Sequence, residues 1–142
     1  MKKNYIKFRH AGLVTNNIKK SLFFYINVIG LELIKKNKEN SKNMQHILGK
    51  KFEFLNTYKL GVNNNVIIEV LDFQNKKKIK KIDQTGFTHI AISVSNIEKI
   101  YKKIIQNKFK TLTKPSYSDD KKVKLFFCRT PEGAFLEIVE TL

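Results

Sequence analysis

One segment occurs twice in this chain, first as His10-Ala11-Gly12-Leu13-Val14-Thr15-Asn16-Asn17-Ile18 and, 79 positions later, as His89-Ile90-Ala91-Ile92-Ser93-Val94-Ser95-Asn96-Ile97. Each copy opens with a histidine and ends with the pair Asn-Ile. Small and apolar residues stand between them. The recurrence indicates an internal duplication, so we expect two copies of one structural unit.

The residues around the first copy predict a strand, a helix and three further strands. Residues 6–14 alternate as in a strand, and Ile18, Leu22, Tyr25, Ile26 and Ile29 recur at helical spacing. Thr15 or Asn16 is the expected N-cap of this helix, and Gly30 its end. Residues 31–34 begin a strand, and 52–60 and 66–73 form two more, with a turn at 61–65. The polar stretch 35–51 is predicted to be rich in loops, with a short helix around Met44, Ile47 and Leu48.

The second copy repeats this order. A strand at 87–94 precedes a helix marked by Ile97, Ile100, Tyr101, Ile104 and Ile105. A short strand is expected to start within 110–113, and residues 122–127 alternate. A turn at 130–133 then leads into a closing strand at 134–139. The lysine-rich residues 74–86 separate the copies. We predict one domain over 1–142, with modules at about 5–73 and 87–142 and a linker at about 74–86.

Length and composition narrow the class of protein. The chain has 142 residues, enough for one domain with a core, and no apolar run near the ~20 residues of a membrane span. Its basic start leads into no signal-type stretch, so a cytoplasmic protein is expected, without a membrane partner. Cys128 is the only cysteine. It excludes an internal disulfide, and its apolar surroundings favour a buried, inert thiol.

The net charge of +16 raises the question of nucleic-acid binding. The chain holds 26 Lys and only 2 Arg, although Arg is the usual residue for bidentate phosphate and guanine contacts. The lysines are spread over nearly every segment. We therefore predict no nucleic-acid partner. Most of the charge is expected on solvated surface, and attraction of an anionic small substrate is the favoured binding role.

Two glutamates complete the duplicated pattern. Glu69 stands 59 residues after His10, and Glu137 stands 48 after His89, each within an apolar strand pattern. A buried carboxylate needs a partner, and imidazole with carboxylate suits one divalent ion of Zn, Ni, Co, Mn or Fe. Taken singly, these residues could be half-exposed strand and core groups. Their matched places favour one metal site built from all four. His46 has no counterpart and is expected at the surface.

The chain resembles the vicinal oxygen chelate superfamily, which includes glyoxalases, methylmalonyl-CoA epimerases, extradiol dioxygenases and bleomycin- or fosfomycin-resistance proteins. Residues 21–32 (SLFFYINVIGLE) resemble its helix with the FYxxxLG ending. Residues 68–73 (IEVLDF) resemble its first ligand strand, and 86–94 (GFTHIAISV) the start of its second module. Residues 130–139 (TPEGAFLEIV) resemble its DPDGxxxELxE hairpin, with Thr130 and Glu132 replacing the two aspartates. Both replacements fall at turn positions, away from the ligands.

The resemblance implies an α+β fold of two βαβββ modules that form a curved eight-stranded mixed sheet with helices on its outer face. His10, Glu69, His89 and Glu137 would point into the concave side and chelate one metal ion. The family often dimerises by sharing modules between chains, so the four ligands could come from one chain or from two. We expect a homodimer.

The ligand set separates the chemistries of this family. Extradiol dioxygenases have no ligand at the place of Glu69, and epimerases of the methylmalonyl-CoA type commonly have Gln there. Glyoxalase I is similar in all four ligands. Its glutathione-dependent members carry an Arg shortly after the first His and an Asn just after the first Glu, whereas this chain has residues 12–14 (GLV) and 70–73 (VLDF) there. The resemblance does not extend to glutathione binding.

The resulting hypothesis is a metal-dependent lyase or isomerase of the glyoxalase I type, which moves the α-proton of a small oxygenated carbonyl substrate. Glu137 or Glu69 would be the base. Arg129, just before the closing turn, is a candidate for binding a substrate anion, against the alternative of an exposed strand-end residue. The alternative functions are an acyl-thioester epimerase, then an extradiol-type dioxygenase or a metal-free drug-binding protein.

Overall fold

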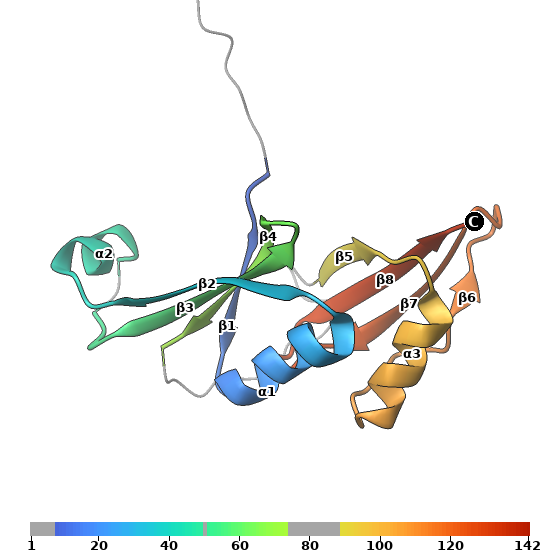
Figure 1. Ribbon diagram of the computed structural model, residues 1–142, viewed down its shortest axis with the longest axis horizontal. Coiled ribbons are helices and arrows are strands. Elements are labelled where there is room, and N and C mark those ends of the chain that lie inside the picture. Colours follow the sequence, from blue (N-terminus) through green and yellow to red (C-terminus); the bar gives the residue numbers. More distant parts are fainter. Residues whose placement is uncertain (1–7, 50, 74–88) are drawn as a thin grey trace, which may run out of the picture.

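The computed structural model describes residues 8–49, 51–73 and 89–142, and these form two units of the same plan (Figure 1). Each unit is a four-stranded mixed sheet with a helix packed on one face. The predicted α+β class and the two βαβββ modules are confirmed. The linker predicted at 74–86 lies outside the described residues.

The first module contains β1 (Ala11–Thr15), α1 (Ile18–Leu22), η1 (Phe23–Ile29), β2 (Glu32–Glu39), α2 (Lys42–Ile47), β3 (Leu55–Val62) and β4 (Asn65–Asp72). α1 runs directly into η1, whose hydrogen bonding is of the π type. The strand order is β1-β4-β3-β2. β1 is parallel to β4, and the other neighbours are antiparallel.

The second module contains β5 (His89–Ser93), α3 (Ile97–Gln106), β6 (Ser116–Tyr117), β7 (Val123–Arg129) and β8 (Phe135–Thr141). Its strand order, β5-β8-β7-β6, repeats that of the first module. β5 is again parallel to the last strand, β8. The duplication inferred from the sequence is therefore present in the topology as well.

The two main helices begin in the same way. The side chains of Asn17 and Asn96 accept hydrogen bonds from the backbone N–H groups three residues later, at 3.1 and 2.9 Å. The prediction of Thr15 or Asn16 as the first cap was wrong. Thr15 is buried at the end of β1, where its hydroxyl lies 2.6 Å from that of Ser21. Gly30 ends the first helix as predicted, with φ at +96°.

The polar stretch after Ile34 was predicted as mostly loop, but β2 extends to Glu39. β2 is an edge strand of its sheet. Edge strands tolerate charged side chains. The lysines of β2 therefore resemble a loop in the sequence, although they belong to a strand. The short helix predicted in this stretch is confirmed as α2. In the second module, the strand expected from 110 is an isolated bridge between Thr111 and Cys128, and the short strand β6 lies further on.

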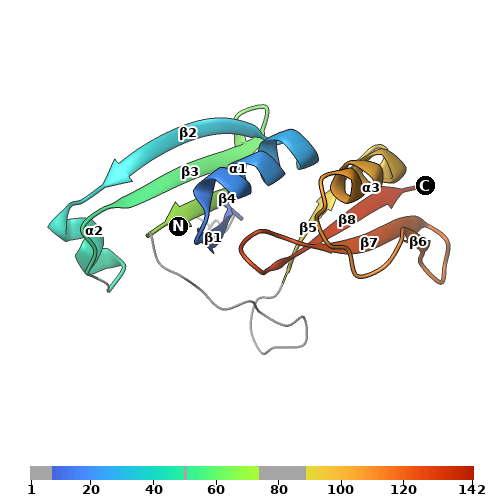
Figure 2. The same ribbon diagram turned by 90° about the horizontal axis from the view of Figure 1, so that it is seen from below.

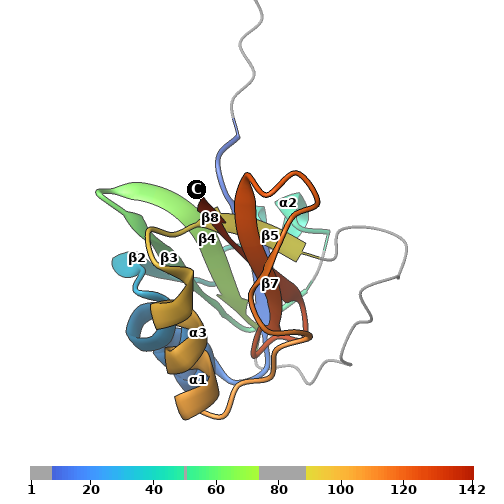
Figure 3. The ribbon, with the colours of Figure 1, turned by 90° about the vertical axis from the view of Figure 1, so that its right-hand side faces the viewer.

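One hydrophobic core joins the modules through their helices. η1 and α3 lie side by side (Figure 3). The ring of Phe24 meets the ring of Phe109 edge-on, with 4.7 Å between centroids. Figure 2 shows the two sheets extending to either side of this helix pair. Within the described residues, the eight strands form two hydrogen-bonded sheets of four strands each, rather than one continuous eight-stranded sheet.

A partly buried hydrogen bond also crosses between the modules. The hydroxyl of Tyr25, in η1, donates to Oε2 of Glu132, in the turn before β8, at 2.8 Å. Burial, and then the Glu132 carboxylate, raise the pKa of Tyr25 well above its usual value, so its hydroxyl keeps the proton that it donates. The other oxygen of Glu132 is buried without a hydrogen-bond partner in the described structure. This carboxylate therefore depends on Tyr25.

Cys128 belongs to this core, as the sequence predicted. The residue is fully buried in β7. Burial raises the pKa of its thiol to about 12. Since the thiolate is the reactive form, Cys128 is an inert core residue rather than a nucleophile. No helix in the described residues is long and apolar enough to cross a membrane.

We expect Tyr25→Phe to lower the free energy of unfolding by about 2 kcal/mol, because it leaves a buried carboxylate without its donor. Urea denaturation measures the change. Tyr117→Phe is the matched control, since Tyr117 is 60% exposed and its hydroxyl can bond to water. Equal effects of the two substitutions would contradict a role for the Tyr25–Glu132 bond in joining the modules.

We expect the thiol of Cys128 to resist a disulfide reagent at pH 8 in the folded protein and to react fully once the protein is denatured. Both its burial and its raised pKa keep the thiolate population low at that pH. Absorbance of the released thiolate measures the reaction. Raising the pH toward 12 should speed the reaction of folded protein. Rapid reaction at pH 8 would show that Cys128 is not buried in solution.

Candidate functional site

The first candidate pair lies on the sheet face that the helix does not cover. Glu69 alternates with the buried core residues Ile68 and Val70 along β4, so its side chain points to the opposite face. His10 directly precedes β1, the parallel neighbour of β4. Its Nε2 atom lies 3.0 Å from Oε2 of Glu69. The sequence placed both residues among four proposed ligands of one metal ion, and the structure brings these two together.

The second pair is built in the same way. Glu137 alternates with the buried residues Leu136 and Ile138 along β8. His89 begins β5, the parallel neighbour of β8, and its Nε2 atom lies 3.6 Å from Oε2 of Glu137. The ring of His89 also meets the ring of Phe127 edge-on, at 5.4 Å.

The two pairs occupy equivalent places in the strand register. Gly12, two residues after His10, stands opposite Glu69. Ala91, two residues after His89, stands opposite Glu137. The duplicated topology therefore accounts for both contacts, because parallel pairing of the first and last strands fixes which residues meet.

All four side chains are partly exposed. The glutamates are 18% and 21% exposed, and His10 and His89 are 28% and 43% exposed. The carboxylates are thus partly open to solvent on the uncovered sheet face, outside the hydrophobic core. Each carboxylate faces an imidazole nitrogen, which leaves nitrogen and oxygen donors directed at the same space.

Glu69 and Glu137 differ in the residue that pairs with each of them on the neighbouring antiparallel strand. Lys59 of β3 pairs with Glu69 in the register, and its Nζ atom is 3.9 Å from Oε1 of Glu69. Phe127 of β7 occupies the corresponding place opposite Glu137. Sequence reasoning did not single out Lys59. The alternation of β3 would have placed it on the site face once its pairing with β4 was known.

The two pairs remain separate within one chain. Among residues 8–49, 51–73 and 89–142, no three or more His, Cys, Asp or Glu side chains come close enough together to hold a metal ion. His10 meets Glu69, and His89 meets Glu137, but the four do not converge. Each pair alone offers two donors, which is half of an ordinary tetrahedral site.

Arg129, the other residue proposed for the site, lies close to the turn that follows it. Its Nη1 atom donates to the carbonyl of Gly133 at 3.3 Å, and its guanidinium lies 4.5 Å from the centroid of the Phe135 ring. Both contacts help to shape the hairpin between β7 and β8. His46 is exposed on α2, as the sequence predicted for it.

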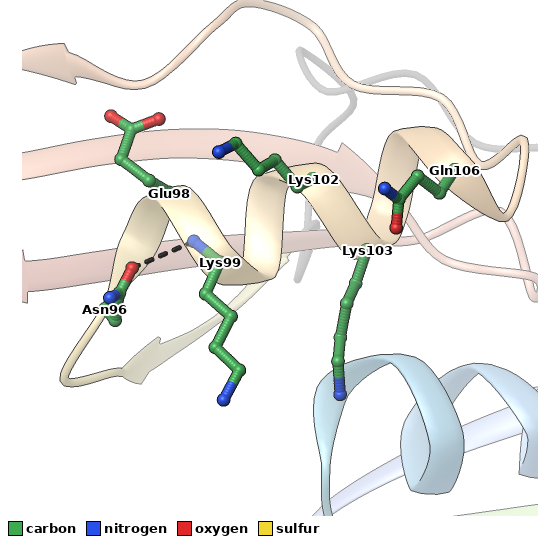
Figure 4. Close-up of a pocket in the computed structure, with 6 residues that line it drawn as sticks. All are labelled: Asn96, Glu98, Lys99, Lys102, Lys103 and Gln106. Atoms are coloured by element: carbon green, nitrogen blue, oxygen red, sulfur yellow. Dashed lines mark hydrogen bonds between the residues drawn. The ribbon is translucent and has the colours of Figure 1, made fainter.

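A hollow lies on the surface of α3, and none of its lining residues belongs to a His–Glu pair (Figure 4). Its lining residues all come from this helix and its cap: Asn96, Glu98, Lys99, Lys102, Lys103 and Gln106. It contains none of the four proposed ligands. The side chains are those of a solvated helix face, so the His–Glu pairs remain the candidate site.

Comparisons with solved structures agree with this fold. A glyoxalase family protein from Bacillus cereus has a TM-score of 0.83 at 15% identity, over 99% of this chain and 97% of that one. A glyoxalase family protein from Enterococcus faecalis has a TM-score of 0.69 at 18% identity, over 94% and 97%. A mutant glyoxalase I from Zea mays has a TM-score of 0.70 at 19% identity, over 94% of this chain and 46% of that one. At these identities the likeness concerns the fold.

A search of curated proteins finds no match to this chain. The family model of the Glyoxalase/Bleomycin resistance protein/Dioxygenase superfamily matches residues 7–138, nearly the whole sequence. This match agrees with the duplicated βαβββ topology and with the resemblance found in the sequence motifs. The chain belongs to the Glyoxalase/Bleomycin resistance protein/Dioxygenase superfamily.

Proposed function

We propose that the protein is a divalent-metal-dependent lyase or isomerase, which moves the α-proton of a small oxygenated carbonyl substrate. The observation that carries this proposal is the presence of two His–Glu pairs at the same register position of two sheets. Both pairs lie on sheet faces that the helices leave uncovered. Family membership supports a site on this face, and the donor chemistry supports a metal.

The residues fit a divalent ion in kind and in exposure. In each pair an imidazole nitrogen faces a carboxylate oxygen, at 3.0 Å in the first pair and 3.6 Å in the second. Such donors suit Zn, Ni, Co, Mn or Fe. Partial exposure leaves room for an ion and a substrate to enter.

The separation of the pairs within one chain supports a homodimer with shared sites. Two donors hold a metal ion weakly, so each pair needs a second pair. In a two-fold dimer, His10 and Glu69 of one protomer can face His89 and Glu137 of the other. Symmetry then creates two equal sites from two copies of each pair.

A bound divalent ion would supply Lewis-acid stabilisation of the negative charge that develops on the substrate oxygen. His10 and His89 would hold it, and a carboxylate of the chain would take the proton from the carbon next to the carbonyl. We assign this base to Glu137. Glu69 lies 3.0 Å from His10 and has a cation, Lys59, as its other neighbour, whereas Glu137 lies 3.6 Å from His89 and faces the uncharged ring of Phe127.

We expect the purified protein to take up one divalent ion per chain, and Glu69→Gln and His89→Ala each to weaken the uptake by about tenfold or more. Each substitution removes one donor of the proposed set while leaving the core intact. Titration with zinc or nickel, followed by calorimetry, measures the affinity.

His46→Ala is the control for this experiment, because it removes the exposed histidine of α2, which lies outside both pairs. It should leave the affinity unchanged. Retention of full metal content by both Glu69→Gln and His89→Ala would rule out the four-residue chelate.

We expect two inactive double variants to restore one another when they share a dimer. One variant carries His10→Ala with Glu69→Gln, and the other His89→Ala with Glu137→Gln. A mixed dimer then has one complete site and one site without donors, so random mixing should restore about a quarter of the sites. Co-expression from two tagged copies supplies the mixture, and deuterium incorporation at the α-carbon of dihydroxyacetone in D₂O measures activity.

The mixing experiment separates the two ways of building the site. If each site were made within one chain, no combination of the double variants would be complete, and activity and tight metal binding would stay absent. Wild-type protein that binds metal but exchanges no α-proton, over a panel of hydroxy-carbonyl compounds, would contradict the proposed reaction.

A further inference from the structure

We infer that Lys59, with Lys35 beside it, binds an anionic group of the substrate, so that the substrates are small hydroxy-carbonyl compounds that carry a phosphate or a carboxylate. This inference rests on the proposed function, because it places the anionic group next to the ligand Glu69. It adds a substrate class that neither the family match nor the proposed reaction specifies.

Glu69, Lys59 and Lys35 follow one another across three neighbouring strands, and we call the two lysines the Lys59–Lys35 row. Lys59 stands opposite Glu69 on β3, and Lys35 stands opposite Lys59 on β2. Residues paired in this way share a sheet face, so both ammonium groups lie on the uncovered side with the candidate ligands. The side chain of Lys59 is 30% exposed and that of Lys35 is exposed.

The fold itself does not require a lysine at position 59. Its neighbours Tyr58 and Leu60 are buried on the other face and supply the core contacts of β3. The second module has Phe127 at the corresponding place and forms the same strand pairs. A partly covered lysine is costly to desolvate compared with an apolar residue, so the charge points to a role on the site face.

The ion pair with Glu69 leaves Lys59 available to an anion. The Nζ atom of Lys59 is 3.9 Å from Oε1 of Glu69, beyond ordinary hydrogen-bond length. Glu69 can serve a divalent ion or the Lys59 ammonium fully, but not both. With Glu69 engaged as a ligand, the Lys59 ammonium is free to meet another negative partner, and an anionic substrate group would supply one.

Arg129 is less well placed for this role. Its guanidinium donates to the Gly133 carbonyl and covers the ring of Phe135, so the hairpin already uses it. The net charge of +16 attracts anions to the whole surface, and the Lys59–Lys35 row is the place where we expect an anionic substrate group to bind.

The test compares three probes on one protein, namely dihydroxyacetone phosphate, hydroxypyruvate and uncharged dihydroxyacetone. Calorimetry on metal-loaded and metal-free protein gives the Kd of each. We expect wild-type protein to bind at least one of the charged probes about tenfold or more tightly than dihydroxyacetone, and Lys59→Gln to reduce that preference to about twofold or less. The phosphate and carboxylate probes show which anionic group the row accepts.

Lys36→Gln is the matched control. It removes the same charge from β2, but Lys36 stands opposite the core residue Tyr58 and lies over its ring, on the other sheet face. It should keep the wild-type preference. Lys35→Gln provides a second variant at an exposed position should Lys59→Gln fold poorly, and it should reduce the preference by about threefold.

The inference is overturned if wild-type protein shows no preference for a charged probe, if neither Lys59→Gln nor Lys35→Gln reduces it, or if Arg129→Gln alone abolishes it. Failure of the proposed function would look different, because wild-type protein would then take up no divalent ion. The Nζ atom of Lys59 stands 3.9 Å from Glu69 without a metal ion as well. A preference on metal-free protein that Lys59→Gln removes would therefore still support the role of Lys59, and no preference there would overturn it.

Discussion

The parallel pairing of the first and last strands in each module is the constraint on which the site depends. Parallel strands cannot be joined by a tight turn, so a helix and two further strands lie between them along the chain. Once β1 lies beside β4, the register sets Gly12 opposite Glu69 and so brings His10 to the same carboxylate. The same pairing of β5 with β8 does this again for His89.

The helices use the other face of each sheet, and this division decides where chemistry can occur. η1 and α3 pack on one another and close a single core between the modules. The partly buried Tyr25–Glu132 hydrogen bond links the same two modules. Polar ligands are excluded from that side, since the side chains there are close-packed and apolar. The uncovered faces carry the two His–Glu pairs.

Much of this arrangement could be predicted from the sequence, because duplication and alternation act locally. The repeated His segment, the helical spacing after it and Gly30 all gave correct elements. Prediction from local sequence patterns was wrong where contacts between elements decide the extent of a strand or the residue that caps a helix. β2 continues through a run of lysines because an edge strand can expose them, and Asn17 caps the helix because Thr15 is taken by the end of β1.

The residues of the two His–Glu contacts could be picked out from the sequence, but the spatial relation between the two contacts could not. Two His–Glu pairs follow from matched positions in a duplication, whereas the separation of the pairs within one chain depends on how the modules pack. No pattern along the sequence reports that packing. Lys59 was missed for a related reason, since only the register between β3 and β4 sets it beside Glu69.

The two modules share one strand register but differ in the residues that surround their His–Glu pairs. Lys59 faces Glu69 where Phe127 faces Glu137, so one carboxylate has a cation for a neighbour and the other has an aromatic ring. In a dimer that joins unlike modules, every site would receive one of each kind. A substrate in such a site would meet charge at one side and a ring at the other, which would orient it before any proton moves. In such a dimer, duplication would supply matched His–Glu pairs, and divergence between the copies would supply the direction.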